Sequence, residues 1–119
     1  MDVPLNEKSI RILQDLLEYD NQQTRQALRD LFKDSLFTPR YNISLDEERE
    51  LAYQRLKSIC DNQLISVLDF KDNPHRIFSV HEAVGMMDGS AATKMTVQFN
   101  LFGGTILKLG TQTHHDQLL

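Results

Sequence analysis

The stretch that decides the fold runs from Ala91 to Gly110 and reads AATKMTVQFNLFGGTILKLG. It contains no carboxylate and more apolar residues than one face of a helix requires. An α-helix over this stretch has one apolar stripe made of Ala91, Met95, Phe99 and Phe102. At roughly 100° per residue, a second stripe, made of Val97 and Leu101, lies about 160° away. A helix with two apolar sides must be covered on both sides. A chain of this length can cover one side, so we expect the second stripe to need another domain, a partner or an apolar ligand.

The same stretch also permits a strand. Residues 95–101 read MTVQFNL, and strict alternation of apolar and polar residues is typical of a half-buried strand. By pattern alone, the strand is slightly favoured here. A helix N-cap at Asp88 or Ser90, the helix-favouring Ala91 and Ala92, and helical patterns on both sides favour the helix instead.

The rest of the chain predicts further helices. Periodicity and capping signals place them at 6–17, 21–33, 44–60 and 73–88, with one turn at 105–109 and a last helix after Thr111 that His114 helps to cap. Ser44 and Glu47 form a capping box, and Asn73-Pro74 is a typical N-cap followed by proline at N1. We expect Gly103-Gly104 to break the two-sided helix, because glycine weakens a helix interior by about 1 kcal/mol.

Four of these helices have one face that we expect to be buried. In the helix at 6–17 this face is made of Ile10, Leu13, Leu16 and Leu17, and in the helix at 21–33 of Leu28, Leu31 and Phe32. In the helix at 44–60 it is made of Leu51, Ala52, Leu56 and Ile59, and in the helix at 73–88 of Ile77, Phe78, His81 and Val84. Between the helices, residues 36–43 are expected to be an extended connector that Phe37 and Tyr41 anchor. Residues 64–70 are expected to be a buried, partly extended link. The sequence therefore predicts an all-α domain of about six helices.

The composition bounds the function. A chain of 119 residues is at most one domain, 1–119, and its 40% hydrophobic and 25% charged residues are ordinary for a globular protein. A net charge of −4 argues against a nucleic-acid partner. Lys94 and Lys108 interrupt the best candidate for a membrane span. The single cysteine, Cys60, rules out an internal disulfide and indicates a reducing compartment, and the first residues do not read as a secretory signal.

No complete active site can be assembled from the residues. His114 and His115 point about 100° apart on a helix, so they cannot chelate one metal ion together. His81 is expected to be a hydrogen-bonded core or interface residue, and we expect no metal site. Gly103-Gly104 lacks the context of a phosphate-binding loop and is expected to allow close helix packing. The carboxylates at 46–50 are expected to be a solvated helix start.

Longer strings in the chain point to a family. These are SLFTPRYN at 35–42, SLDEERELA at 44–52, NPHRIF at 73–78, and TKMTVQFNLFGGTILKLG at 93–110, followed by Thr111 and His114. From about Leu28 onward they resemble the peroxisomal acyl-CoA oxidases, most closely the plant-type and bacterial members. The resemblance implies the N-terminal helical domain of the acyl-CoA dehydrogenase/oxidase fold, and it implies a helix over residues 95–101.

The resemblance also implies a function. Members of the family are FAD-dependent enzymes of fatty-acid β-oxidation that dehydrogenate fatty acyl-CoA between the α and β carbons and reduce O2 to H2O2. Their flavin site and catalytic glutamate lie in a β-domain and a C-terminal helical bundle. We expect the chain to stop before that β-domain, to contain no catalytic or FAD-binding residue, and to be inactive and free of FAD on its own.

By matching position, Thr93, Val97 and Leu101 are expected to wall the cavity of the acyl tail, which would account for the second apolar stripe. The implied full-length enzyme is a peroxisomal homodimer in which this chain packs against the remainder of the polypeptide. Two alternatives stay open. One is a non-enzymatic helical interaction module, and the other is an acyl-CoA dehydrogenase of the same superfamily.

Overall fold

The computed structural model describes residues 6–118, and within this range every regular element is helical. The helices are α1 (Glu7–Leu17), α2 (Gln22–Leu31), the 3-10 turn η1 (Ser35–Phe37), α3 (Leu45–Asp61), α4 (Asp69–Asp72), α5 (Pro74–Met87), α6 (Gly89–Met95), the π-helix η2 (Thr96–Gly103), α7 (Gly104–Leu109) and α8 (Gln112–Leu118). The predicted all-α fold is therefore confirmed, and the strand alternative for residues 95–101 is wrong.

Local capping signals set the helix starts as predicted. The Ser44 side chain accepts from the amide of Glu47 while the Glu47 carboxylate accepts from the amide of Ser44, which completes the capping box of α3. Asn73 caps α5, with Pro74 in its first turn. Asp88 caps α6 by accepting from the amide of Ser90. These contacts span two or three residues, so the sequence alone specifies them.

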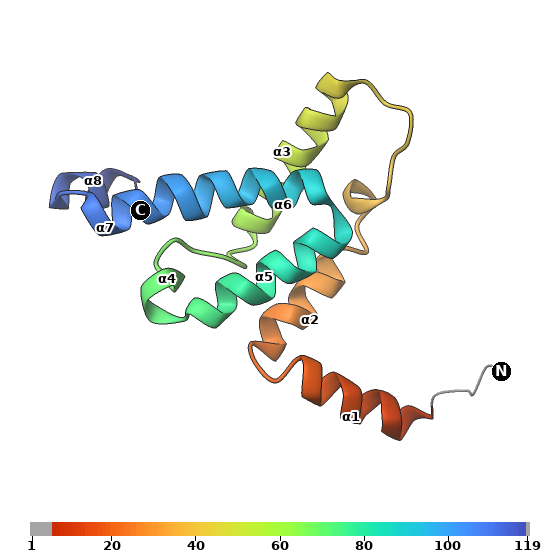
Figure 1. Cartoon of the computed structure of the whole chain (residues 1–119). Helices are drawn as coiled ribbons and strands as arrows, with labels where there is room; N and C mark the ends of the chain where they lie inside the picture. The colour runs from red at the N-terminus through yellow and green to blue at the C-terminus, as the bar shows by residue number, and fades with distance from the viewer. Residues whose placement is uncertain (1–5, 119) are drawn as a thin grey trace.

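One long helix dominates the molecule. The backbone stays helical from Gly89 through Leu109, so α6, η2 and α7 form a single rod that crosses α3 and α5 (Figure 1). The expected break at Gly103-Gly104 is wrong, because both glycines have helical backbone angles. A Cβ atom at Gly103 would lie 2.5 Å from Cγ2 of Val67, so this glycine serves close packing, as expected for the pair.

The core lies where this rod packs on α3 and α5, with α2 packed against α5. Its buried side chains are Leu28, Phe37, Leu56, Ile59, Leu64, Ile65, Ile77, Val80, Val84, Ala91 and Met95. The first apolar stripe of the rod is thus buried at Ala91 and Met95 and half-buried at Phe99, which packs against the core. Phe102, expected in the same stripe, is 54% exposed, and the wider turns of η2 explain why.

Three further expectations about burial are wrong. The apolar face of α1 buries nothing among the described residues, because this helix projects away from the body (Figure 1). Phe37 is buried as expected, but Tyr41 is exposed and anchors nothing. On α5, Phe78 is exposed and Val80 is buried, since the face toward α2 and α6 follows Ile77, Val80 and Val84.

Candidate functional site

A surface groove of about 460 Å³ lies between the first half of α3 and the start of the long rod. Its lining consists of Leu45, Glu48, Arg49, Ala52, Ser90, Thr93, Lys94, Val97 and Gln98. The structure thus brings together two of the three predicted wall residues, Thr93 and Val97. Leu101 lies outside the groove, one turn further along the rod, and is 62% exposed. A volume of this size falls within the range of about 300–1,000 Å³ that ligand pockets have.

Some polar groups of the groove already form hydrogen bonds or ion pairs within the chain, and others do not. The Ser90 hydroxyl donates to the Glu48 carboxylate at 3.0 Å, and the Thr93 hydroxyl donates to the carbonyl of Gly89 at 2.9 Å. Arg49 contacts the exposed carboxylate of Asp46 at 3.3 Å. Within the described residues, the Lys94 ammonium has no ion-pair partner. The groove therefore presents apolar surface beside two cationic side chains and the Glu48 carboxylate.

A buried arginine fixes the two sides of this groove relative to each other. Arg55 donates from Nε to the carbonyl of Leu36 at 2.9 Å, and its two terminal nitrogens donate to the carbonyl of Thr38 at 2.8 Å and to the Asp88 carboxylate at 2.7 Å. Because Asp88 also caps α6, Arg55 ties α3 directly to the start of the rod. Sequence analysis did not single out Arg55. Its position could have indicated its burial, because Arg55 lies three residues after Ala52 and therefore on the apolar face of α3.

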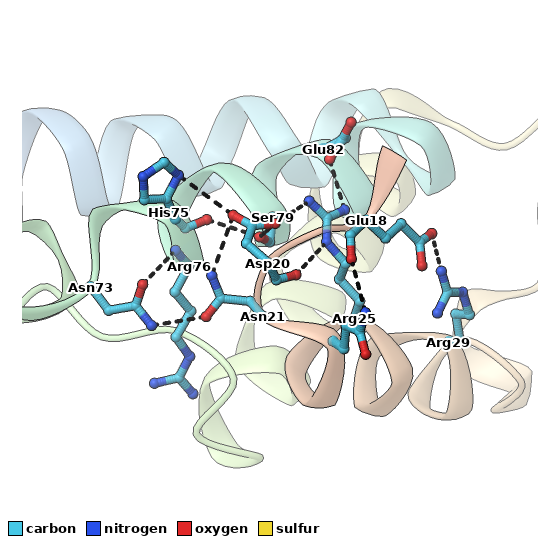
Figure 2. Close-up of polar contacts among 11 residues, drawn as sticks. Glu18, Asp20, Asn21, Arg25, Arg29, Asn73, His75, Arg76, Ser79 and Glu82 are labelled. Carbon is cyan, nitrogen blue, oxygen red and sulfur yellow. Dashed lines mark hydrogen bonds and ion pairs between the residues drawn. The ribbon is translucent and has the colours of Figure 1, made fainter. Parts of the chain in front are cut away.

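A second polar cluster joins the α1–α2 connection to α5, as Figure 2 shows. Arg25 donates to the carboxylates of Asp20 at 2.9 Å and Glu82 at 2.8 Å. His75 lies 3.5 Å from Asp20, and Asn73 donates to Asn21 at 2.8 Å. Burial alone would raise the pKa of Asp20, but the hydrogen bond and charge of Arg25 outweigh it and hold that pKa below its ordinary value.

The Ser79, His75 and Asp20 side chains in this cluster do not form a nucleophilic triad. The Ser79 hydroxyl donates to the backbone carbonyl of His75 at 2.9 Å and approaches Asp20 at 3.4 Å, so no imidazole nitrogen receives its proton. A serine nucleophile needs a base within hydrogen-bond reach. Ser79 is also fully buried, where no substrate reaches it. The cluster therefore holds helices together and supplies no nucleophile.

The remaining histidines and the cysteine have structural contacts. His81 Nδ1 lies 2.9 Å from the carbonyl of Ile77, so the expected hydrogen bond is present, and the residue is half-buried. His114 contacts the amide and hydroxyl of Thr111, as expected for the start of α8, while His115 Nε2 meets the carbonyl of Ile106 at 2.9 Å. Burial raises the pKa of the Cys60 thiol, which lowers its reactivity.

Searches for two special classes of site gave negative results over residues 6–118. This part of the chain contains no group of three or more His, Cys, Asp or Glu side chains that could hold a metal ion. None of its helices is long and apolar enough to cross a membrane.

Comparison with known proteins identifies several relatives, all of them named as peroxisomal acyl-coenzyme A oxidases. The chain is 39% identical over 84 residues to acyl-coenzyme A oxidase 2, peroxisomal, of Arabidopsis thaliana, which covers 63% of this chain and 11% of the relative. It is 31% identical over 86 residues to peroxisomal acyl-coenzyme A oxidase 3 of Homo sapiens, covering 71% of this chain and 12% of the relative. Acyl-coenzyme A oxidase 3, peroxisomal, of Arabidopsis thaliana is 27% identical over 85 residues, or 69% of this chain and 13% of its own length.

These matches confirm the resemblance to the peroxisomal acyl-CoA oxidases that the sequence strings predicted. The matched part of the chain spans only 11–13% of the length of these relatives. No family model and no solved structure matches the chain.

Proposed function

We propose that this chain is the N-terminal helical part of an FAD-dependent peroxisomal acyl-CoA oxidase and that its long helix walls the acyl-tail cavity of that enzyme. One observation carries the proposal. Ala91 and Met95 of the first apolar stripe are buried in the core and Phe99 packs against it, whereas Val97 and Leu101 are 46% and 62% exposed. Folding of the described residues does not use this second stripe, so it is available for an apolar ligand.

The residues that supply this wall are Thr93, Val97 and Leu101. Thr93 and Val97 line the groove beside α3, and Leu101 continues the apolar surface along the rod. The groove also contains Arg49 and Lys94, whose charges suit an anionic acyl-CoA, and one carboxylate, Glu48, which accepts from Ser90. The chain's role in this proposal is to bind and orient the tail and to exclude water from it.

The described residues do not fit an FAD site. The one glycine pair considered for a phosphate, Gly103-Gly104, lies inside a helix, and Val67 occupies the space above Gly103. Backbone amides bound in a helix interior cannot cradle a phosphate, which needs the free amides of a loop or a helix start. We therefore assign no redox step and no catalytic base to this chain. In this proposal the flavin site and the base belong to the remainder of the polypeptide, and the complete enzyme is a peroxisomal homodimer.

A non-enzymatic interaction module is the second candidate, and α1 favours it. Five aliphatic side chains of this helix are exposed, and the oxidase proposal uses none of them: Ile10, Ile12, Leu13, Leu16 and Leu17. The release of H2O2 distinguishes an acyl-CoA oxidase from an acyl-CoA dehydrogenase. The polypeptide that carries this segment should release H2O2 when supplied with fatty acyl-CoA and O2. Acyl-CoA oxidation without peroxide would indicate an acyl-CoA dehydrogenase, and no oxidation at all would favour the interaction module.

The wall is tested by Val97→Asp in the complete enzyme. A carboxylate against the acyl tail must lose its hydration when substrate binds, which costs several kcal/mol, on the order of the transfer of a polar group out of water. Turnover should therefore fall for long-chain acyl-CoA before short-chain acyl-CoA, while flavin content stays normal.

Phe99→Asp is the matched control for Val97→Asp. Phe99 packs against the core, so a charge there should lower the yield of folded protein instead of changing chain-length preference. Equal losses of soluble protein in both variants would contradict the two-sided helix and the choice of wall residues.

A further inference from the structure

We infer that Phe102 is a fourth residue of the acyl-tail wall, and that the π-helical segment η2 puts it there; this inference rests on the function proposed above. An uninterrupted α-helix would assign Phe102 to the core stripe with Ala91, Met95 and Phe99. In the structure, Phe102 is 54% exposed and faces away from that core. The residue that follows it, Gly103, is buried instead.

The geometry of a π-helix accounts for this exchange. A π-helical turn closes i→i+5 hydrogen bonds, so it holds one residue more than an α-helical turn. One extra residue turns the following side chains back by roughly 100°. The inward-facing positions of the rod accordingly run in steps of four through η2, at Ala91, Met95, Phe99 and Gly103, and return to a step of three at Ile106.

The same rotation brings Phe102 beside the predicted wall. In an α-helix, Phe102 would lie about 140° from Val97, on the other side of the rod. After the turn of roughly 100°, it lies within about 40° of Val97, next to Leu101. Val97, Leu101 and Phe102 are 46%, 62% and 54% exposed and thus form one outward apolar strip.

Packing locks the rod in this register. A Cβ atom at Gly103 would meet Val67 at 2.5 Å, so the position that faces Val67 has no room for a phenylalanine. On one side of η2, Ala91 and Met95 are fully buried in the core. On the other side, Ile106 is buried, and its carbonyl contacts His115 of α8. The rod is held at both ends, so the extra residue stays in the middle and Phe102 stays outside.

The chemistry of the surroundings indicates the occupant of the strip. Val97 also lines the groove that contains Arg49 and Lys94, together with one carboxylate, Glu48, which accepts from the Ser90 hydroxyl. Residues 89–115 include two lysines and no carboxylate, although the chain as a whole has a net charge of −4. An apolar strip that continues into a groove with cations suits a ligand with a long apolar tail and an anionic head. A long-chain acyl thioester of coenzyme A has both.

The test uses the absence of tryptophan from the chain. Phe102→Trp, Val97→Trp and Phe78→Trp each give a single fluorescent reporter in the 119-residue chain. Phe78 is exposed on α5 and makes the matched control, because it undergoes the same Phe→Trp exchange outside the strip. Emission wavelength and acrylamide quenching are measured for each variant alone, with palmitoyl-CoA below its micelle concentration, and with free coenzyme A.

We expect the Phe102→Trp variant alone to emit at long wavelength and to be quenched readily. Palmitoyl-CoA should shift the emission of the Val97→Trp and Phe102→Trp variants to shorter wavelength and reduce their quenching. Free coenzyme A should change neither variant, and the Phe78→Trp variant should respond to neither compound. A reporter that is already shielded in the Phe102→Trp variant alone would overturn the inference, because it would indicate α-helical register.

The remaining outcomes separate this inference from the proposed function. A response of the Val97→Trp variant without one of the Phe102→Trp variant would remove Phe102 from the wall and leave the proposed function intact. No response of either variant would count against the wall itself and overturn both. Equal responses of all three variants would indicate adsorption to any exposed aromatic side chain and would also overturn the inference.

Discussion

At the scale of single residues, buried charges join helices that lie far apart in the sequence. Arg55 is 6% exposed and meets one carboxylate and two carbonyls, so its charge is paired and its donors are directed at acceptors. Removing one partner from such a buried pair costs about 3–5 kcal/mol, because the other charge is left without compensation. Asp20 has the same role at the α1–α2 connection, where Arg25, Ser79 and His75 surround it.

The Asp20 contacts predict a specific dependence of stability on pH. Its folded-state pKa lies below the ordinary value of 3.8, so its contribution to stability is complete above that pH and is lost as pH falls through the folded pKa. Asp20→Asn should be less stable than the parent at neutral pH by about 1–3 kcal/mol, because Arg25 loses a charged partner. The difference between the two proteins should shrink as pH falls below 3.8.

Urea unfolding followed by circular dichroism measures this difference. Asp46→Asn is the control, because Asp46 pairs with Arg49 on the surface, where ion pairs contribute about 0–1 kcal/mol. A difference between parent and Asp20→Asn that is the same at every pH would contradict the assignment. Glu18 also has a lowered pKa, chiefly from its hydrogen bond with Arg29, so the parent retains some acid sensitivity in both comparisons.

At the scale of elements, the rod from Gly89 to Leu109 contains two neighbouring glycines, of which only Gly103 is closely packed. Gly103 and Gly104 have the same helical conformation, so backbone freedom does not distinguish them. Their surroundings differ. A Cβ atom at Gly103 would lie 2.5 Å from Val67, whereas the nearest atom to one at Gly104 is the Phe99 carbonyl oxygen at 3.7 Å.

Alanine at these two positions should therefore have opposite effects. Gly103→Ala should lower the free energy of unfolding by about 1–3 kcal/mol, since the side chain of Val67 is stiff and the site is overpacked. Gly104→Ala should raise the free energy of unfolding by up to about 1 kcal/mol, from the higher helix propensity of alanine. Thermal and urea unfolding of both variants measure the effects. Val67→Ala added to Gly103→Ala should recover part of the loss, and equal effects at the two glycines would refute this packing.

At the scale of the whole molecule, the described chain is extended. Its radius of gyration is 16.7 Å, while a compact domain of this length has roughly 13–14 Å. The principal extents of 59 × 38 × 21 Å match the picture of a flat body with α1 projecting from it (Figure 1). An isolated helix as short as α1 is marginal in water, so its exposed apolar face needs a contact outside the described core.

Deleting residues 1–17 tests how independent α1 is. Because α1 buries no residue, the shortened chain should keep its unfolding midpoint within experimental error. It should also self-associate less than the parent in sedimentation velocity, since contiguous exposed apolar surface promotes association. A large drop in the midpoint would show that α1 contributes to the core after all. Leu17→Asp offers the same comparison without shortening the chain.

The sequence by itself determined the helix starts, the buried stripe and the family. Ser44 with Glu47, Asn73 with Pro74, and Thr111 with His114 make contacts over no more than three residues, so their pattern is complete in the local sequence. The stripe of Ala91, Met95 and Phe99 follows from helical periodicity. Of the candidate site, the sequence placed Thr93 and Val97 on one face, and their role toward a ligand stays a prediction.

Only the tertiary structure decided whether Gly103-Gly104 breaks the long helix, which helix faces are buried, and on which side of the rod Phe102 lies. Position 103 has room only for glycine because Val67, which lies 36 positions earlier in the chain by their residue numbers, occupies the space that a side chain would fill. Arg55 is stable inside an apolar face because Asp88 and the carbonyls of Leu36 and Thr38 meet it there. Each of these outcomes depends on residues distant in sequence, and helical periodicity is blind to such contacts because it counts only neighbours along the chain.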